Sequence, residues 1–218
     1  MPNRNSDIPM IRRGFGLKEA VAGTLAGEYN SDLIKYLRSN GLSLALPDIQ
    51  ILLAKEFGFC YGVDRAVDFA YETREKFPDR TIYITSEIIH NPIVNRKLGS
   101  MGIRFLSGGD GENYQYSDIQ PADIVILPAF GASVSELEIL AKIGCVLVDT
   151  TCGSVMNVWK RVERNAKDGY TSIIHGKYSH EETIATSSRV SQFPGGCYLI
   201  VRDEEQTNDV CDYIIRGG

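Results

Sequence analysis

Short apolar runs rich in β-branched residues alternate with segments of helical periodicity from residue 49 onward. The runs predict strands at residues 49–54, 81–85, 103–106, 123–127, 146–148, 171–174 and 198–201. The periodic segments predict helices at residues 63–77, 92–101, 133–143, 155–166 and 204–215. Because strands that alternate with helices form parallel sheets covered by helices, the pattern predicts an α/β fold with mostly parallel sheets.

The first 48 residues have a different pattern and predict an N-terminal helical extension. One helix is expected at residues 17–26, and a second begins after Ser31, a favourable N-cap, and ends near Gly41. The polar segment 108–116, GGDGENYQY, predicts a surface loop.

Composition narrows the class of protein. The 218 residues are 43% hydrophobic and 23% charged, with a net charge of -5, which is ordinary for a globular protein and argues against a nucleic-acid-binding surface. No apolar run approaches the roughly 20 residues of a membrane span. The polar start MPNRNSDIPM has no apolar signal-peptide core, so a cytosolic or organelle-stroma location is expected.

The five cysteines form no CxxC pair, and their odd number argues against a disulfide framework. Cys60 lies between two glycines in FGFCYG. It could be a small buried residue, half of a disulfide, a nucleophile or a metal ligand. Cys152 precedes a predicted helix, where a thiolate for attack or ligation is stabilised, although a small buried residue also fits. Cys145, Cys197 and Cys211 are predicted to be core residues.

Five unusual segments follow predicted strands: those at Cys60, His90, Phe130 and Cys152, and the segment 175–180. Ligands of open α/β sheets bind beyond the carboxyl ends of strands, so these turns are expected to converge on one site.

Each histidine segment has two interpretations. His90 precedes Asn91-Pro92 at a predicted helix start, which suits a phosphate, but it also fits a surface residue beside a helix cap. In HGKYSHEET, His175, Lys177 and His180 could bind an anion and Glu182 could donate a proton, or the segment is a polar surface loop. Histidine together with glutamate in this segment would also suit a zinc hydrolase, although the HExxH motif is absent.

The motifs GFCYGVDRA, SEIIHNPIVN, VILPAFGAS, VDTTC and HGKYSHEET occur in one order. Together they resemble the 4-hydroxy-3-methylbut-2-enyl diphosphate reductase (LytB) family, and RRGFGLKEAV with Phe130 resembles its cyanobacterial and plant-like branch. The resemblance implies a trefoil of three α/β units. On that frame, residues 1–48 are the extension, residues 49–150 the first unit, and residues 151–218 an incomplete second unit of an N-terminal fragment.

The resemblance also implies a function, the last step of the non-mevalonate isoprenoid pathway. Members are iron-sulfur oxidoreductases that remove the allylic hydroxyl and give isopentenyl and dimethylallyl diphosphates. By this resemblance, Cys60 and Cys152 are ligands of a [4Fe-4S] cluster, His90 and His180 bind the diphosphate, and Glu182 is the acid. It further implies ferredoxin or flavodoxin as electron donor, and a bacterial cytoplasm or plastid stroma as location.

Two departures from the family qualify these expectations. The third cluster cysteine is absent from this chain, so the chain is expected to hold no stable cluster alone and to be inactive. Gly153 and Asn157 stand where the family has proline and lysine, so a looser second ligand is expected. The alternatives are a non-catalytic diphosphate-binding fragment and a zinc-dependent hydrolase that uses His175, His180 and Glu182.

Overall fold

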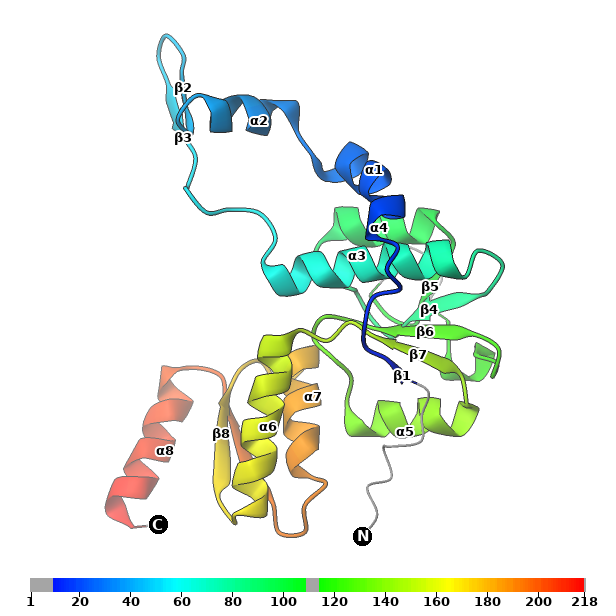
Figure 1. Cartoon of the computed structure of the whole chain (residues 1–218). Coiled ribbons are helices and arrows are strands. Elements are labelled where there is room, and N and C mark those ends of the chain that lie inside the picture. The colour runs from blue at the N-terminus through cyan, green and yellow to red at the C-terminus, as the bar shows by residue number, and fades with distance from the viewer. Residues whose placement is uncertain (1–9, 109–113, 218) are drawn as a thin grey trace.

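A five-stranded parallel sheet forms the centre of the molecule (Figure 1). The computed structural model describes residues 10–108 and 114–217. The strand order is β1-β7-β6-β4-β5, and every neighbouring pair is parallel. The strands are β1 (Met10–Ile11), β4 (Ile82–Ile84), β5 (Ile103–Phe105), β6 (Ile124–Leu127) and β7 (Val146–Asp149).

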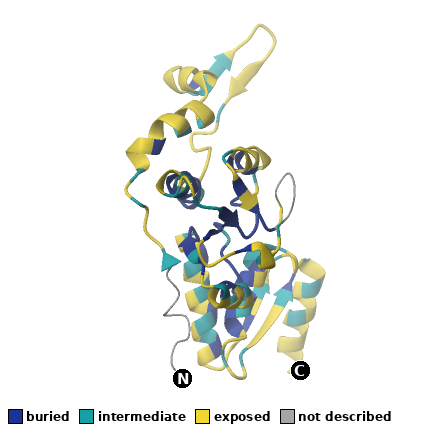
Figure 2. Cartoon of the chain, turned by 90° about the vertical axis from the view of Figure 1, so that its right-hand side faces the viewer, coloured by how far each residue is buried: buried dark blue, intermediate teal, exposed yellow. Residues whose placement is uncertain are grey.

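Helices cover both faces of this sheet. Helices α3 (Tyr61–Lys76) and α4 (Pro92–Ser100) lie on one face, and α5 (Val134–Ile143) lies on the other (Figure 1). Alternate residues along β6 enter two different cores, with Ile124 and Ile126 in the α3 core and Val125 and Leu127 in the α5 core. Burial on both faces explains why β6 is apolar throughout, and Figure 2 shows the buried residues gathered in this layer.

A second, smaller unit follows β7. It contains α6 (Gly153–Lys167), β8 (Thr171–His175), α7 (Glu181–Val190), β9 (Cys197–Val201) and α8 (Glu204–Arg216). Strands β8 and β9 pair in parallel, and α6 packs against α7. The predicted α/β class with parallel sheets is confirmed, whereas the predicted unit boundaries at residues 49–150 and 151–218 stay predictions.

The N-terminal region differs from the expectation. Helices α1 (Lys18–Tyr29) and α2 (Asp32–Ser39) confirm the helical prediction, and the Ser31 side chain caps α2 by accepting from Ile34 N. However, the predicted strand at 49–54 is β3 (Gln50–Leu52), which pairs antiparallel with β2 (Ser43–Ala45) in a projecting arm (Figure 1). The sheet edge is instead extended by β1, a two-residue strand too short to give a periodic signal.

Helix α7, three cysteines and one loop can also be compared with the sequence-based expectations. Helix α7 was not predicted, because its sequence EETIATSSRV is polar and its apolar positions are few. Cys145 is buried as predicted, but the core assignment of Cys197 and Cys211 is wrong. Both are exposed because β9 belongs to a two-stranded sheet and α8 has no buried residue. Most of the predicted loop at 108–116 lies outside the described residues.

Within residues 10–108 and 114–217, no helix has the length and apolar character required to cross a membrane.

Candidate functional site

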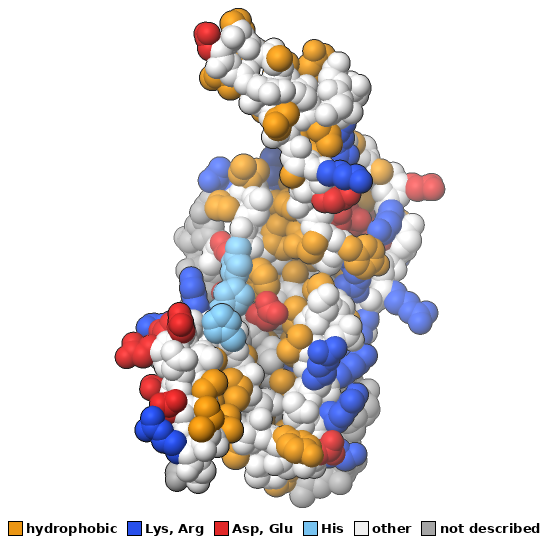
Figure 3. Space-filling model, turned by 90° about the vertical axis from the view of Figure 1, so that its left-hand side faces the viewer, with side chains coloured by type: hydrophobic (Ala, Val, Ile, Leu, Met, Phe, Trp, Pro, Cys, Tyr) orange, Lys and Arg blue, Asp and Glu red, His pale blue; other side chains and the backbone are white. Residues whose placement is uncertain are grey.

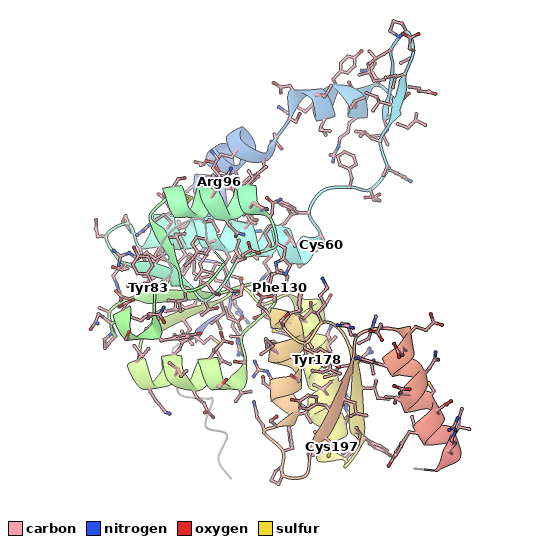
Figure 4. All side chains as sticks on the ribbon, turned by 180° about the vertical axis from the view of Figure 1, so that it is seen from behind. Cys60, Tyr83, Arg96, Phe130, Tyr178 and Cys197 are labelled. Carbon is pink, nitrogen blue, oxygen red and sulfur yellow. The ribbon has the colours of Figure 1, made fainter. Side chains whose placement is uncertain are left out.

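Three adjacent strands of the central sheet lead into the candidate site. The segments after β4, β6 and β7 carry His90, Phe130 and Cys152, and these strands are neighbours in the order β7-β6-β4. Their carboxyl ends therefore meet at one edge of the sheet. Figure 4 shows Phe130 where the central sheet meets the second unit, with Cys60 nearby at the start of α3.

His90 and His180 meet although they are 90 residues apart in the sequence. Their Nε2 atoms are 3.0 Å apart and share a hydrogen bond. The Phe130 ring stacks on His90 with a centroid separation of 4.2 Å and an interplanar angle of 22°. It meets His180 edge-on at 5.6 Å. Figure 3 shows histidine side chains together on one face, beside an acidic side chain and above a hollow with hydrophobic walls.

The partners of the two imidazoles define their tautomers. Glu87 Oε2 lies 2.8 Å from His90 Nδ1 and, as a carboxylate, accepts a hydrogen bond from Nδ1–H. The backbone N–H of Glu182 donates to His180 Nδ1 at 3.2 Å, so a neutral His180 carries its proton on Nε2. His180 therefore donates from Nε2 to the bare Nε2 of His90.

Helix starts position both rings. Asn91 caps α4 by accepting from the backbone N–H groups of Ile93 and Val94, and Pro92 follows at a position that suits the first helical turn. Asn91 is thus the helix cap, and His90 still faces the site. His180 is itself the N-cap of α7. Two imidazoles beside two helix N-termini are an arrangement that suits an anion, because helix N-termini carry partial positive charge.

A metal ion fits this site less well. His90, His180 and Glu181 place ligand atoms within 4.8 Å of one another, and they form the one such group in the described part of the chain. His90 is oriented as a metal ligand, with a carboxylate behind its ring. The Nε2 of His180 cannot ligate in its present tautomer, because its proton is there while Nδ1 accepts from the α7 backbone.

The zinc-hydrolase set of His175, His180 and Glu182 does not assemble as a group of ligands in residues 10–108 and 114–217. His175 donates from Nε2 to the carbonyl oxygen of Arg202 at 3.2 Å. The carboxylate that approaches His90 Nε2 is Glu181, at 3.9 Å. This alternative is therefore not supported by the geometry.

Cys60 and Cys152 occupy equivalent positions at the N-caps of α3 and α6, and neither side chain caps its helix. The two helix starts are in contact, because a Cβ added at Gly62 would lie 2.4 Å from Cys152 Sγ. Arg65 joins them further by donating to the carbonyl oxygens of Thr150 at 3.2 Å and Thr151 at 3.3 Å. The glycine brings the turn that carries Cys60 up to the second thiol.

The remaining cysteines do not join this pair. Cys145 is buried in the α5 core, and Cys211 is on exposed α8. Cys197 lies at the start of β9, at the end of that strand away from Phe130 (Figure 4). The described residues thus offer two thiols at the site. Two thiolates fit part of a ligand set for an iron-sulfur cluster but are fewer than the usual four, or three with one open iron.

Glu182 is half-buried and follows the His180 cap. It lines a pocket of about 530 Å³ together with His175, Lys177 and His180. A carboxyl group at this place can reach a ligand that binds between the helix start and β8.

Sequence reasoning missed three residues that shape the site. Glu87 and Glu181 contact His90, and Gly62 contacts Cys152. A signal existed for Glu87, which precedes His90 by three residues in SEIIHNP. Glu181 and Gly62 become recognisable only when the separate segments meet.

The sequence of this chain is similar to those of known proteins. The LytB protein family model matches residues 51–214. The chain is 53% identical over 207 residues to the 4-hydroxy-3-methylbut-2-enyl diphosphate reductase of Microcystis aeruginosa, covering 95% of this chain and 50% of that protein. The reductase of Thermosynechococcus vestitus gives the same identity and coverage. The chain spans about half the length of the curated relatives it matches.

Two solved structures have the same fold over part of their length. The Plasmodium falciparum E-1-hydroxy-2-methyl-but-2-enyl-4-diphosphate reductase matches with a TM-score of 0.61 and 30% identity, covering 71% of this chain and 45% of that one. The second is a structure of (E)-4-hydroxy-3-methyl-but-2-enyl diphosphate reductase, described as the terminal enzyme of the non-mevalonate pathway. It matches with a TM-score of 0.59 and 31% identity, covering 74% of this chain and 54% of that one. The family model, the relatives and the fold agree, and the chain belongs to the LytB family.

Proposed function

We propose that the chain supplies the diphosphate-binding and acid-bearing half of a 4-hydroxy-3-methylbut-2-enyl diphosphate reductase. The reaction is the reductive removal of the allylic hydroxyl, which gives isopentenyl and dimethylallyl diphosphates. The single observation that carries the proposal is the His90–His180 contact at 3.0 Å, made by two helix starts. This contact creates a place that suits an anion, and the named members of the family act on a diphosphate, which is an anion.

In this proposal each residue has a limited role. His90 and His180 hold the diphosphate from α4 and α7. Glu182 lines the adjacent pocket and gives a proton to the departing hydroxyl. Phe130 contributes an aromatic face instead of a hydrogen bond.

The cofactor of the proposed enzyme is a [4Fe-4S] cluster, which would supply electrons and an open iron for the substrate oxygen. Cys60 and Cys152 would provide two of its thiolates, and the geometry at Gly62 brings their helix starts together. A reduced ferredoxin or flavodoxin is the proposed electron donor.

Titration calorimetry with three ligands tests the proposal. The chain is expected to bind 4-hydroxy-3-methylbut-2-enyl diphosphate and inorganic pyrophosphate, but not the uncharged diol that lacks the diphosphate. Equal binding of all three, or binding of none, would contradict a diphosphate site.

Anaerobic reconstitution with iron and sulfide tests the cofactor. Because the described residues offer two cysteines at neighbouring helix starts, the chain alone is expected to retain no stable four-iron cluster and to show no reductase turnover. Four irons per chain, with the corresponding EPR signal and turnover, would show that this chain completes the ligand set itself.

A further inference from the structure

We propose that an anion which binds at the His90–His180 pair brings one proton onto His90, with Glu87 as the positioning residue that holds the new charge. The inference rests on the proposed function, because it takes the anion to be a diphosphate. Beyond the proposed function, it states that anion binding is accompanied by uptake of one proton and that Glu87 positions the protonated ring.

The hydrogen-bond pattern of the pair sets the number of protons. The two Nε2 atoms are 3.0 Å apart, and the other contacts of the two rings assign the one proton between them to His180 as donor and His90 as acceptor. The two outer contacts fix this arrangement, because Glu87 can only accept from His90 Nδ1 and the Glu182 backbone N–H can only donate to His180 Nδ1.

A deprotonated phosphate oxygen can only accept, so each ring must present an N–H to hold it. His180 already has a proton on Nε2 and needs only to redirect it. His90 has its proton on Nδ1, and its Nε2 is bare. One proton, from solvent or from a protonated oxygen of the arriving anion, must therefore join His90 Nε2, and no covalent bond between the chain and the ligand forms or breaks.

Two carboxylates and an aromatic face surround the His90 ring. Glu87 lies behind it with 2.8 Å between Oε2 and Nδ1, and Glu181 Oε2 lies 3.9 Å from Nε2. The Phe130 face is stacked on the ring, and an aromatic face attracts a cation. His180 is the remaining titratable neighbour, and its Nδ1 is held by α7.

Glu87 and Glu181 differ in what they do when the anion arrives. Glu87 is bonded to the nitrogen that points away from the ligand, so it keeps its contact. Glu181 is near the nitrogen that receives the ligand, where its charge opposes the anion. Glu87 is therefore expected to couple proton uptake to binding, and Glu181 makes a matched control.

Imidazole ¹⁵N NMR tests the inference on the chain as it is, since three histidines give three readily assigned spin systems. At about pH 8, above the pKa of an unperturbed imidazole, the free chain is expected to show His90 protonated on Nδ1 and His180 on Nε2. Inorganic pyrophosphate at saturation is expected to give a doubly protonated His90. His175 is expected to be unchanged.

Two substitutions identify the positioning residue. In Glu87→Gln, pyrophosphate is expected to bind at least about tenfold more weakly, and His90 is expected to stay singly protonated. In Glu181→Gln, the double protonation of His90 is expected to persist. Proton uptake in Glu87→Gln equal to that of the unmodified chain would overturn the role of Glu87.

The outcomes separate this inference from the proposed function. If pyrophosphate shifts the His180 signals while His90 remains singly protonated, the anion site stands and the proton uptake is refuted. If neither imidazole responds, both the site and the inference fail.

Discussion

Gly62 lies so close to the thiol of Cys152 that a single added carbon would collide with it. The distance from an added Cβ to Cys152 Sγ is 2.4 Å, shorter than any real contact of that kind. Gly62 is also inside α3, where alanine is normally preferred to glycine. The glycine is therefore explained by the approach of the two cysteine-bearing helix starts.

Gly62→Ala is expected to lower the free energy of unfolding by about 1–3 kcal/mol, because overpacking outweighs the gain in helix propensity. The measurement is urea denaturation. Gly23→Ala is the matched control, since Gly23 is in α1 with nothing within 4 Å of an added Cβ. That change is expected to stabilise by about 0.5–1 kcal/mol. Stabilisation by both substitutions would contradict the close contact.

Gly153 is the first residue of α6, a position at which a helix accepts proline readily. Cys152 before it has extended backbone, with ψ of 140°, which a following proline permits. An added Cβ at Gly153 meets nothing within 4 Å. Gly153→Pro is therefore expected to raise the free energy of unfolding by about 0.4–1 kcal/mol, with urea denaturation as the measurement. A loss of stability would show that α6 does not begin as the structure places it.

The cysteines differ in their expected reactivity. Burial raises the pKa of the Cys145 thiol to about 11, whereas Cys197 and Cys211 are exposed. Thiol-specific alkylation at about pH 8, followed by mass spectrometry, is expected to modify Cys197 and Cys211 in the folded chain. Cys145 is expected to react only after unfolding, because the thiolate is the reactive form. Equally fast labelling of Cys145 would show that the α5 core is open.

At the scale of elements, one arginine joins three segments. Arg65 on α3 donates to Thr150 O and Thr151 O beyond β7, and to Arg12 O beyond β1 at 2.8 Å. These contacts fix the start of α3 against the turn that carries Cys152. They explain how an element outside the sheet reaches the same edge as the strand ends.

Arg65→Met is expected to lower the free energy of unfolding by about 1–3 kcal/mol, because carbonyl acceptors lose charged donors. Arg216→Met serves as the control. Arg216 pairs with Asp212 at 2.7 Å on the exposed α8, and such a surface pair contributes about 0–1 kcal/mol. Equal effects of the two substitutions on urea denaturation would contradict a joining role for Arg65.

Most strands of the central sheet, and the helices that follow them, were predictable because their own sequences contain apolar runs and helix caps. The apolar runs of β4, β6 and β7 are buried on both faces, and Asn91 and Ser133 cap the helices that follow β4 and β6. The two residues of β1 are too few for periodicity, and the polar sequence of α7 concealed a helix. The run at β3 has strand character, but its partner β2 is local, and no sequence pattern specified that pairing.

At the scale of the whole molecule, the site depends on segments that only the fold brings together. His90 follows β4, Phe130 follows β6, and His180 starts α7 in the second unit. The rule for parallel sheets predicted that the segments carrying all three residues would converge, although β8, which precedes His180, belongs to a separate sheet. The contact with His180, and the exclusion of His175, required the packing of α7 beside α5 and α6. The residue roles themselves came from family resemblance and stay predictions.

We expect His90 and His180, and not His175, to form the diphosphate site. Calorimetric titration of 4-hydroxy-3-methylbut-2-enyl diphosphate into three single variants tests it most directly. His90→Ala and His180→Ala are each expected to weaken binding at least about tenfold, a loss of about 1.4 kcal/mol, because each removes one donor of the pair. His175→Ala is expected to bind like the unmodified chain, since its ring faces Arg202 O. Equal losses in all three variants, or a loss in His175→Ala alone, would contradict the account.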